Sequence, residues 1–541
     1  MKFKDILIAV LLVVVAAVSV SASPDIAVGK DGIDASLPEV TQTYNENNNE
    51  FQIKEFKWGT VKVYRNKAEI ELKNMGNLNK RMVDSIFYHL DRDEDKIEEI
   101  EFRNVKNIND EAFISRRNIK RVKLCSELES IGNRTFAYCA GLKDISIPES
   151  VNSIGVAAFL DCFNLKEITI PKNIRYIKSQ VFECCSGLEN VKMYDNVEVI
   201  EAAAFNCCMS LKRVEMSKKI EKIDAYAFNS CTVLENIDIP EKVKNIEEGA
   251  FNNCSNLIMV TIPKRVSYIT NKMFKDCKKL REIKILGSLK GIGISACEGC
   301  TSLESINLPK SLISIKKCAF NGCTILKNID IPDNVETIGG YAFNGCKSFR
   351  YIRIPSKVSK IETGTFANCI SLKDVDMSEN IVAIGGSAFL SCTGLESITI
   401  PSKVTEIKKC AFQNCTGLRD VNMPEGLLSI SSKAFRKCIS LNNLFVPKSV
   451  KSCDLGEFNN CRNLNNLFIH KDLAKSYDFV INKGLPIFDR NKRVIVIGDE
   501  YKPICYKYRH PESKFYDNKF NDVDGPTQDT PHLLLTWPVN F

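Results

Sequence analysis

Apolar residues recur along most of this chain with a fixed period of 23 residues. Counting from Phe113, phenylalanine returns at every step up to Phe458, and only Cys297 interrupts the column. Within each repeat, Leu-x-x-Ile-x-Ile places β-branched residues two apart, which predicts a short strand with one buried face. A proline often follows and ends that strand, and Val-x-x-Ile predicts a second short extended segment. Ala-Phe-x-x-Cys-x-x-Leu steps by three, the spacing of one helical or 3₁₀ turn.

The regularity of the repeat predicts a solenoid. Fifteen intervals pass between Phe113 and Phe458 without an insertion or deletion. One coil directs about eight side chains inward and cannot enclose them, whereas a stack of coils buries them. We therefore expect about fifteen coils of 23 residues, each with short parallel strands and a helical or 3₁₀ turn. Identical residues then form columns along the solenoid axis.

Cysteine occupies one of these columns, three residues after each phenylalanine position from Phe136 onward. The neighbouring Phe and Leu columns place it inward, where a thiol packs as a small apolar group. Adjacent coils lie about 5 Å apart, close enough for disulfides. Because an odd ladder cannot pair fully and stacking already stabilises the coils, we instead predict a structural ladder of free thiols. It comprises Cys139, Cys162, Cys185, Cys208, Cys231, Cys254, Cys277, Cys300, Cys323, Cys346, Cys369, Cys392, Cys415, Cys438 and Cys461.

The cysteines outside the ladder include one candidate disulfide. Cys184 and Cys207 are 23 residues apart, hence in the same column of adjacent coils, and they would pair in an oxidising compartment. A reduced pair is the alternative. Cys297 and Cys300 form a C-x-x-C sequence, but one fills the phenylalanine column and the other belongs to the ladder, so we assign packing and not zinc or redox chemistry. The others are Cys125, Cys318, Cys410, Cys453 and Cys505.

The N-terminus has the three-part plan of a secretory signal peptide. Lys2 and Lys4 precede the apolar run Ile6–Val20, and the small residues Val20-Ser21-Ala22 form a cleavage site. We expect residues 1–22 to be removed and the mature chain to be secreted or associated with the extracellular surface. An uncleaved signal anchor is the alternative, because the apolar run is near the short limit for a membrane span. No later segment is apolar for long enough to span a bilayer.

Charge and histidine content argue against catalysis and nucleic-acid binding. The chain has 74 Lys and Arg against 66 Asp and Glu, a formal net charge of +8, and the two signs are interspersed, which gives nucleic-acid binding no support. Only four histidines occur, none of them among residues 90–469. No motif joins them to a carboxylate or to Cys505, so we predict no enzyme, no cofactor and no metal site. They are His89, His470, His510 and His532.

Three sequons and one exposed column carry further expectations. Asn133, Asn253 and Asn414 begin Asn-x-Ser/Thr sequences and are candidate N-glycosylation sites. The outward column of the first strand varies in charge and type, and ends in Phe445 and Phe468. We interpret it as a solvated sheet face whose last apolar residues meet a cap; an apolar contact patch is the alternative.

The repeat resembles a known family. The coil from Ile331 to Phe349 departs from that family's motif only at Phe349, where leucine is usual; it otherwise shows Ile331-Pro332, Val335, Ile338-Gly339, Ala342-Phe343 and Cys346. This pattern is similar to that of BspA-like leucine-rich repeats. The resemblance implies a leucine-rich-repeat solenoid of the kind found in secreted or surface proteins of anaerobic bacteria and parasitic protists. It also implies protein recognition, with adhesion to host cells, matrix or other cells. An architectural surface-coat or assembly protein without a specific host ligand is the alternative.

These observations predict one long solenoid between two caps. The signal peptide is followed by a polar leader and N-terminal cap over residues 23–98, with a hairpin at Thr60–Lys73. The repeats cover residues 99–469. A C-terminal cap over residues 470–510 contains the β run Arg493–Gly498 and Pro486–Phe488. Residues 511–541 are expected to form a flexible tail.

Overall fold

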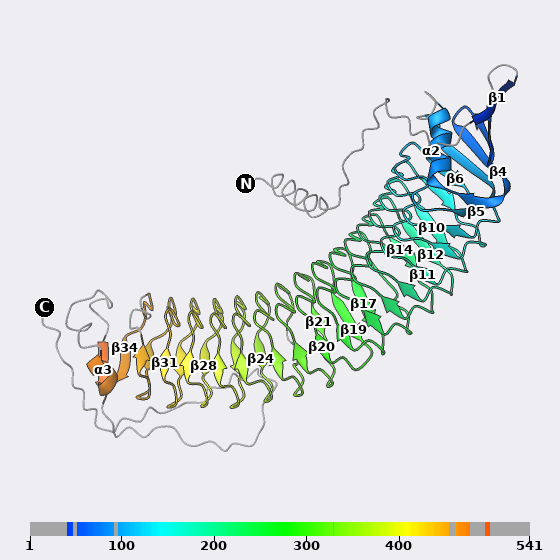
Figure 1. Ribbon diagram of the computed structural model, residues 1–541. Coiled ribbons are helices and arrows are strands. Elements are labelled where there is room, and N and C mark those ends of the chain that lie inside the picture. The colour runs from blue at the N-terminus through cyan, green and yellow to red at the C-terminus, as the bar shows by residue number, and fades with distance from the viewer. Residues whose placement is uncertain are drawn as a thin grey trace.

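The repeats form coils stacked side by side along a curved rod (Figure 1). This computed structural model describes residues 40–46, 51–90, 96–327, 329–453, 458, 460–476 and 493–497. The expected signal peptide, Pro486–Phe488 and the expected tail of residues 511–541 lie outside the described residues. Strand Glu167–Ile170 (β10) pairs in parallel with Asn190–Met193 (β12), and Ile168 faces Val191. The register offset is one repeat, so equivalent residues of neighbouring coils stand side by side.

Each coil contributes a first strand and a second strand, and each kind pairs with its own kind. The described first strands are β6 (Arg121–Lys123), β8 (Asp144–Ser146), β10, β12, β14 (Arg213–Glu215), β17 (Met259–Ile262), β19 (Glu282–Ile285), β21 (Ser305–Ile306), β24 (Tyr351–Arg353), β26 (Asp374–Asp376), β28 (Ser397–Thr399), β30 (Asp420–Asn422), β32 (Asn443–Phe445) and β34 (Asn466–His470). The second strands, of two residues each, are β7 (Ser130–Ile131), β9 (Ser153–Ile154), β11 (Tyr176–Ile177), β13 (Val199–Ile200), β15 (Lys222–Ile223), β16 (Asn245–Ile246), β18 (Tyr268–Ile269), β20 (Gly291–Ile292), β22 (Ser314–Ile315), β23 (Thr337–Ile338), β25 (Lys360–Ile361), β27 (Ala383–Ile384), β29 (Glu406–Ile407), β31 (Ser429–Ile430) and β33 (Ser452–Cys453). Fold class and repeat length are as the sequence predicts.

The segment around each Ala-Phe-x-x-Cys motif is a turn and not a helix, so the expected helical or 3₁₀ turn is not confirmed. In the coil of Phe136, Arg134 (φ 52°) and Tyr138 (φ 63°) are left-handed, and both columns repeat this along the solenoid. Because left-handed residues lie on either side of Phe136, the N–H groups of Arg134, Phe136 and Tyr138 all point to the next coil. They donate to the carbonyls of Val156, Ala158 and Leu160 at 2.9, 2.8 and 2.7 Å, respectively. A helix would keep such bonds within one segment. In this protein, hydrogen bonds between neighbouring coils take the place of hydrogen bonds within a helix.

The N-terminal edge of the solenoid is covered by a small sheet and a helix. Strands β1 (Val40–Glu46), β2 (Phe51–Phe56), β3 (Gly59–Tyr64) and β4 (Lys67–Leu78) form an antiparallel meander, and β3–β4 is the hairpin expected at Thr60–Lys73. Helix α2 (Lys80–His89) follows, with Asn79 as its N-cap. Strand β4 then pairs in parallel with β5 (Glu99–Ile108), which continues into the repeats. The cap thus satisfies the first open strand edge.

At the C-terminal end of the solenoid, one more strand extends the sheet that the first strands of the coils form. Strand β35 (Arg493–Ile497), expected from the β run there, pairs in parallel with β34. The short helix α3 (Lys471–Ser476) directly follows β34. The sheet therefore continues past the last 23-residue repeat, with partners that no longer follow the repeat period.

The phenylalanine column forms the spine of the core. Successive rings stack nearly parallel, with centroid distances from 5.2 Å for Phe205–Phe228 to 6.3 Å for Phe435–Phe458. Most of these rings are fully buried, and each contributes about 1.5–3 kcal/mol of gross hydrophobic stabilisation. The column is interrupted only at Cys297, which is also buried.

Candidate interaction surface

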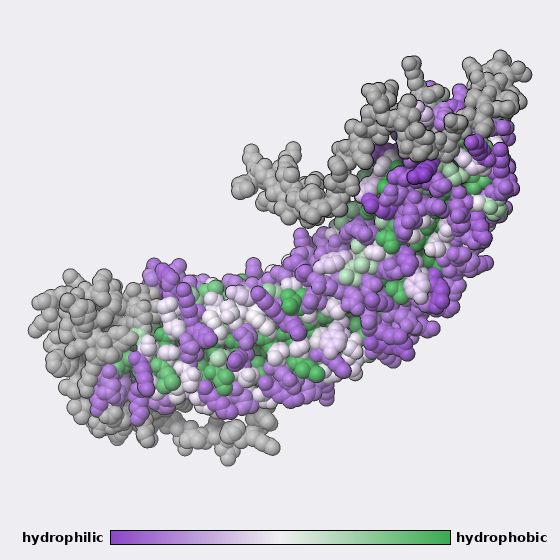
Figure 2. Space-filling view, viewed as in Figure 1, coloured by the Kyte–Doolittle hydropathy of each residue, from purple (hydrophilic) through white to green (hydrophobic). Residues whose placement is uncertain are grey.

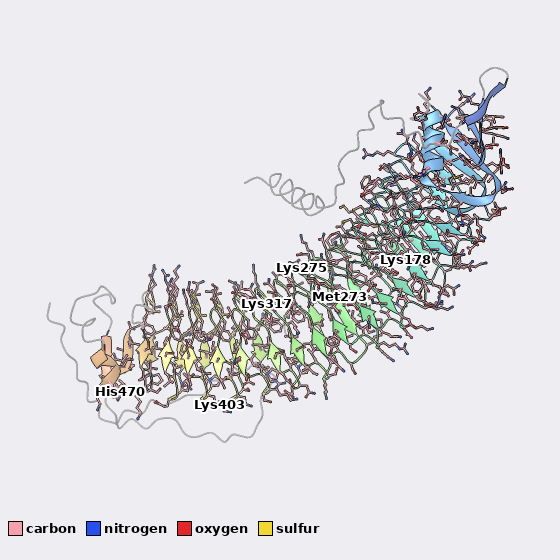
Figure 3. The ribbon with its side chains drawn as sticks, in the orientation of Figure 1. Lys178, Met273, Lys275, Lys317, Lys403 and His470 are labelled. Carbon is pink, nitrogen blue, oxygen red and sulfur yellow. The ribbon has the colours of Figure 1, made fainter. Side chains whose placement is uncertain are left out.

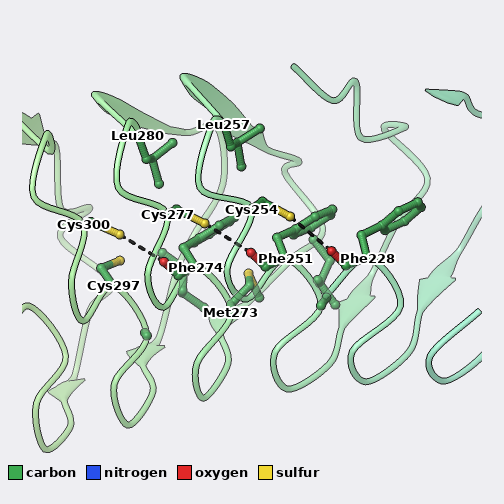
Figure 4. Packing of buried hydrophobic residues seen from close by; sticks show 14 of the residues in the cluster. Phe228, Phe251, Cys254, Leu257, Met273, Phe274, Cys277, Leu280, Cys297 and Cys300 are labelled. Atoms are coloured by element: carbon green, nitrogen blue, oxygen red, sulfur yellow. Dashed lines mark hydrogen bonds between the residues drawn. The ribbon is translucent and has the colours of Figure 1, made fainter. Parts of the chain in front are cut away.

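The fifteen ladder cysteines are buried and act as hydrogen-bond donors. Each thiol donates to the carbonyl of the residue in the phenylalanine column of the preceding coil; Cys254 to Phe228 and Cys277 to Phe251, both at 3.1 Å, are drawn in Figure 4. Burial raises the pKa of the Cys139, Cys254 and Cys369 thiols to about 12. Since the thiolate is the nucleophile and metal ligand, these three thiols stay protonated at neutral pH and serve as packed hydrogen-bond donors.

The C-x-x-C pair lies inside the same core. Cys297 and Cys300 are both fully buried, and the carbonyl of Cys297 accepts the thiol of Cys323 at 3.2 Å. The backbone carbonyl of Cys297 therefore accepts a ladder thiol of the next coil, as the phenylalanine carbonyls do elsewhere in the column. Among the described residues, no group of three His, Cys, Asp or Glu side chains is placed to hold a metal ion.

The structure brings Cys184 and Cys207 together on adjacent coils. Both are free, half-buried thiols in the left-handed conformation. A hydrogen bond from Cys184 lowers the pKa of Cys207, while the same contact and burial raise the pKa of Cys184. Burial also raises the pKa of the nearby Asp161 carboxyl, which interacts with Cys184. Cys207 is therefore the thiol of this pair that ionises first.

The three sequon asparagines already hold contacts to other coils. Asn133 is exposed, but its amide oxygen accepts the Val156 N–H at 2.8 Å and its nitrogen donates to Asp110 at 3.0 Å. The amides of Asn253 and Asn414 are half-buried and donate to serine hydroxyls in the preceding coil at 3.2 and 3.1 Å. Each amide keeps a second N–H, the position that carries a glycan. Glycosylation stays a prediction at all three.

The two described histidines have structural partners. The Nδ1 atom of His89 lies 2.7 Å from the carbonyl oxygen of Ser85, one turn earlier in α2. His470 is buried, with Nδ1 3.3 Å from a carboxylate oxygen of Asp472. They lie at opposite ends of the rod (His470 is labelled in Figure 3). His510, His532 and Cys505 lie outside the described residues.

The outer surface changes from coil to coil while the core stays constant. Hydrophilic residues cover most of the face seen in Figure 2, with apolar residues interspersed. The turn that carries the Phe-x-x-Cys motif lies on the concave side of the rod, where Lys275 and Lys317 are labelled in Figure 3, and the proline turn lies on the convex side, near Lys403. Phe445 and Phe468 stack at 4.1 Å and are half-buried.

Polar ladders follow several outer columns, and sequence reasoning missed them. Asn206 donates to Glu183 at 2.6 Å, Asn229 to Asn206 at 2.7 Å, and Asn252 to Asn229 at 2.7 Å. The Oδ1 atom of Asn252 is buried and has no partner within the described structure. The signal in the sequence was the run of three asparagines, Asn206, Asn229 and Asn252, each directly after a phenylalanine of the repeat column. Whether these asparagine side chains hydrogen-bond to one another follows only from the spacing between neighbouring coils, which the structure supplies.

The fold and its repeat define a leucine-rich-repeat solenoid. A family model for the BspA-type leucine-rich repeat region matches residues 84–212, 198–323, 290–419 and 383–487. The chain therefore belongs to the BspA-type leucine-rich repeat family, as its motif indicates.

Several solved structures resemble this chain. One is a leucine-rich repeat protein from Bacteroides ovatus, with 22% identity, 84% of this chain and 100% of that chain covered, and a TM-score of 0.45. Another is a leucine-rich cell surface protein from Faecalibacterium prausnitzii, with 22% identity, 71% and 95% covered, and a TM-score of 0.35. No curated protein matches the chain. None of the helices in its described part has the length and apolar character of a membrane span.

Proposed function

We propose that this chain is a secreted or cell-surface protein that recognises protein partners along its solenoid, and that it mediates adhesion to host cells, matrix or other cells. One observation carries the proposal. The core columns change at few positions, such as Cys297 and Phe349, whereas the outward column of the first strand changes in charge or size at almost every step, as in Lys192, Glu215 and Asp238. Membership of a leucine-rich-repeat family supports a role in protein interaction. Such solenoids bind partners along an extended face.

Localisation and binding are tested separately. The full chain is expressed in its own cells with a C-terminal epitope, and unpermeabilised cells and culture supernatant are probed. The N-terminal sequence of the extracellular product then tests cleavage after residue 22. Retention of the whole product inside the cell would overturn the proposed location. Saturable binding of residues 23–541 to intact cells or matrix proteins is expected, and its absence on every surface would overturn adhesion.

The architectural alternative makes a different expectation. A surface-coat protein would assemble with itself, so sedimentation of the purified mature chain would show large polymers at concentrations where an adhesin stays monomeric. Polymers without any saturable binding to cells or matrix would favour assembly over adhesion.

A further inference from the structure

Basic residues gather on the concave turns of two neighbouring coils near the C-terminal end of the rod (Figure 3), which we call the basic surface. The turn segments 408–417 and 431–440 contain no carboxylate. All of their cations are exposed except the half-buried Arg436, and none has an ion-pair partner within the described structure. Cations elsewhere on the rod are often paired, as Lys212 is with Glu189 at 2.7 Å. The basic surface comprises Lys408, Lys409, Lys433, Arg436 and Lys437.

An open hollow adjoins this surface in the same coils. Two exposed arginines, Arg419 and Arg462, line this hollow. Arg419 lies in the coil before that of Ser440 and Asn442, and Arg462 lies in the coil after it. Arg436 and Lys437 precede Ser440 by only four and three residues in the same coil, so the hollow and the basic surface adjoin along the chain. Its remaining walls are amides and one carboxylate: Asp420, Asn443, Asn463 and Asn465.

The amides of the hollow are held in fixed orientations. Asn465 donates to the Oδ1 atom of Asn442 at 2.9 Å, and Asn466 donates to Asn443 at 2.7 Å. A primary amide has two N–H groups and an oxygen with two lone pairs. Each bond uses one donor and one acceptor, which leaves both N–H groups of Asn442 and the oxygen of Asn465 for a ligand. Preorganised groups lose little entropy on binding.

We propose that this hollow and the adjoining basic surface bind an acidic saccharide, one that carries sulfate or carboxylate groups. The guanidinium groups of Arg419 and Arg462 match such anions with paired hydrogen bonds. The aligned amides, Ser440 and the Asp420 carboxylate supply donors and acceptors for sugar hydroxyls. This site goes beyond the proposed recognition of protein partners and does not depend on it.

The lining of the hollow favours a saccharide over other polyanions. None of its eight residues is aromatic or aliphatic. Single-stranded nucleic acids are bound by stacking bases on aromatic side chains, and protein hot spots are enriched in Trp, Tyr and Arg in well-packed, desolvated pockets. The hollow offers charge and hydrogen bonds without either kind of apolar platform.

The test measures binding of the full mature chain, residues 23–541, to four labelled oligomers of similar length by fluorescence anisotropy. A heparin oligosaccharide carries sulfate and carboxylate, an oligogalacturonate carries carboxylate only, a malto-oligosaccharide is neutral, and an oligothymidylate is the nucleic acid. We expect one or both acidic saccharides to bind, with affinity that falls as salt rises. The first two oligomers separate a sulfate requirement from a carboxylate requirement. Failure of both, or tighter binding of the oligothymidylate, would overturn the proposal.

Two pairs of variants separate a site from general attraction. Arg419→Gln with Arg462→Gln should raise the Kd about tenfold or more, because two charged hydrogen-bonding groups are lost. Lys278→Gln with Arg281→Gln removes the same charge from equivalent columns of an earlier coil and should change the Kd by less than about twofold. Equal losses in the two variants would mean non-specific attraction and would overturn the site.

A third variant tests the amides without a change of charge. Asn442→Ala with Asn465→Ala should weaken binding several-fold and leave the salt dependence unchanged. Unchanged binding would remove the amides from the site. Thermal unfolding of every variant is followed by circular dichroism, and Arg462→Gln alone replaces any double variant that unfolds early.

Discussion

The thiol of Cys277 donates a hydrogen bond to the backbone carbonyl of Phe251, 3.1 Å away in the preceding coil. The same carbonyl accepts the N–H of Cys254 at 3.3 Å within its own coil. Both lone pairs of a fully buried oxygen are thereby satisfied. This explains why cysteine recurs: alanine would fit the position but could not donate. The ladder joins coils by side-chain bonds in addition to their strands.

Removal of one ladder thiol should destabilise the solenoid. Cys277→Ala loses the bond to Phe251 and leaves a small void, which should lower the free energy of unfolding by about 1–3 kcal/mol. Urea denaturation followed by circular dichroism measures it. Cys318→Ala, in a half-buried position outside the ladder, should stay within about 0.5 kcal/mol. Equal effects would show that the ladder bond does not stabilise the fold.

Thiol reactivity should separate the ladder from Cys207. The ladder thiols are buried, and burial raises the pKa of Cys139, Cys254 and Cys369 among them, whereas the hydrogen bond from Cys184 lowers the pKa of Cys207. In the folded chain, iodoacetamide at pH 7 should label Cys207 first, and its rate should rise with pH until Cys207 is ionised and then level off. Peptide mass spectrometry identifies the site. Cys184→Ser, whose hydroxyl can still donate, is the conservative control, and Cys184→Ala should slow the labelling of Cys207. Labelling of ladder cysteines at a similar rate would contradict this interpretation.

We also expect Cys184 and Cys207 to form a disulfide on oxidation. Equivalent positions in adjacent coils lie about 4.8 Å apart, within the Cα range of disulfides. Two thiols lose two protons and two electrons to an added oxidant such as glutathione disulfide. A loop of this length should stabilise the fold by about 3 kcal/mol, seen as a thermal transition that falls when a reductant is added. Cys207→Ser should abolish the shift; a shift that survives in it would assign the bond elsewhere.

Two glycines should tolerate alanine very differently. Both Gly249 (φ 63°) and Gly345 (φ 72°) are left-handed, but a Cβ at Gly249 would lie 2.4 Å from the Tyr226 ring, and one at Gly345 no nearer than 3.7 Å to any atom. The Tyr226 hydroxyl is held by Glu248 at 2.9 Å. Gly345→Ala should cost about 1–2 kcal/mol for its backbone conformation. Gly249→Ala should cost about 1–3 kcal/mol more, and Tyr226→Ala in the same chain should recover most of that difference.

Acid should weaken the N-terminal cap through Glu101. Lys67 on β4 contacts this carboxylate at 2.7 Å and Lys123 on β6 contacts it at 3.1 Å, and the hydrogen bond from Lys67 lowers the pKa of Glu101. The folded chain therefore holds the carboxylate ionised at a pH where the unfolded chain protonates it. The stabilisation is present above the unfolded pKa of about 4.3 and is lost as the pH falls through the folded value.

Hydrogen exchange of β4 measured between pH 6 and 3 tests this expectation. Glu101→Gln should reduce protection at pH 6 and flatten its pH dependence. Glu336→Gln, an exposed position on a distant coil, should leave both unchanged. A pH dependence that is the same in Glu101→Gln as in the native chain would assign the effect to other carboxylates.

The sequence alone determined the solenoid, its period and its core. The columns of Phe113 to Phe458 and Cys139 to Cys461 are spaced so regularly that one stacking arrangement buries them all, and the structure has that arrangement. The hairpin at Thr60–Lys73 and the strand from Arg493 followed from alternation and β-branched residues, which are local signals.

Tertiary structure decided what depends on contacts one repeat apart. The step of three in Phe-x-x-Cys fits a helical turn equally well, but left-handed residues such as Tyr138 turn the backbone bonds to the next coil. The amide ladder of Asn442 and Asn465, and the hollow between Arg419 and Arg462, likewise join residues whose sequence neighbours give no sign of pairing. A local pattern fixes which residues face inward because burial acts on each coil in the same way. Which outward residues meet depends on the spacing and curvature of the stack, which only the folded chain sets.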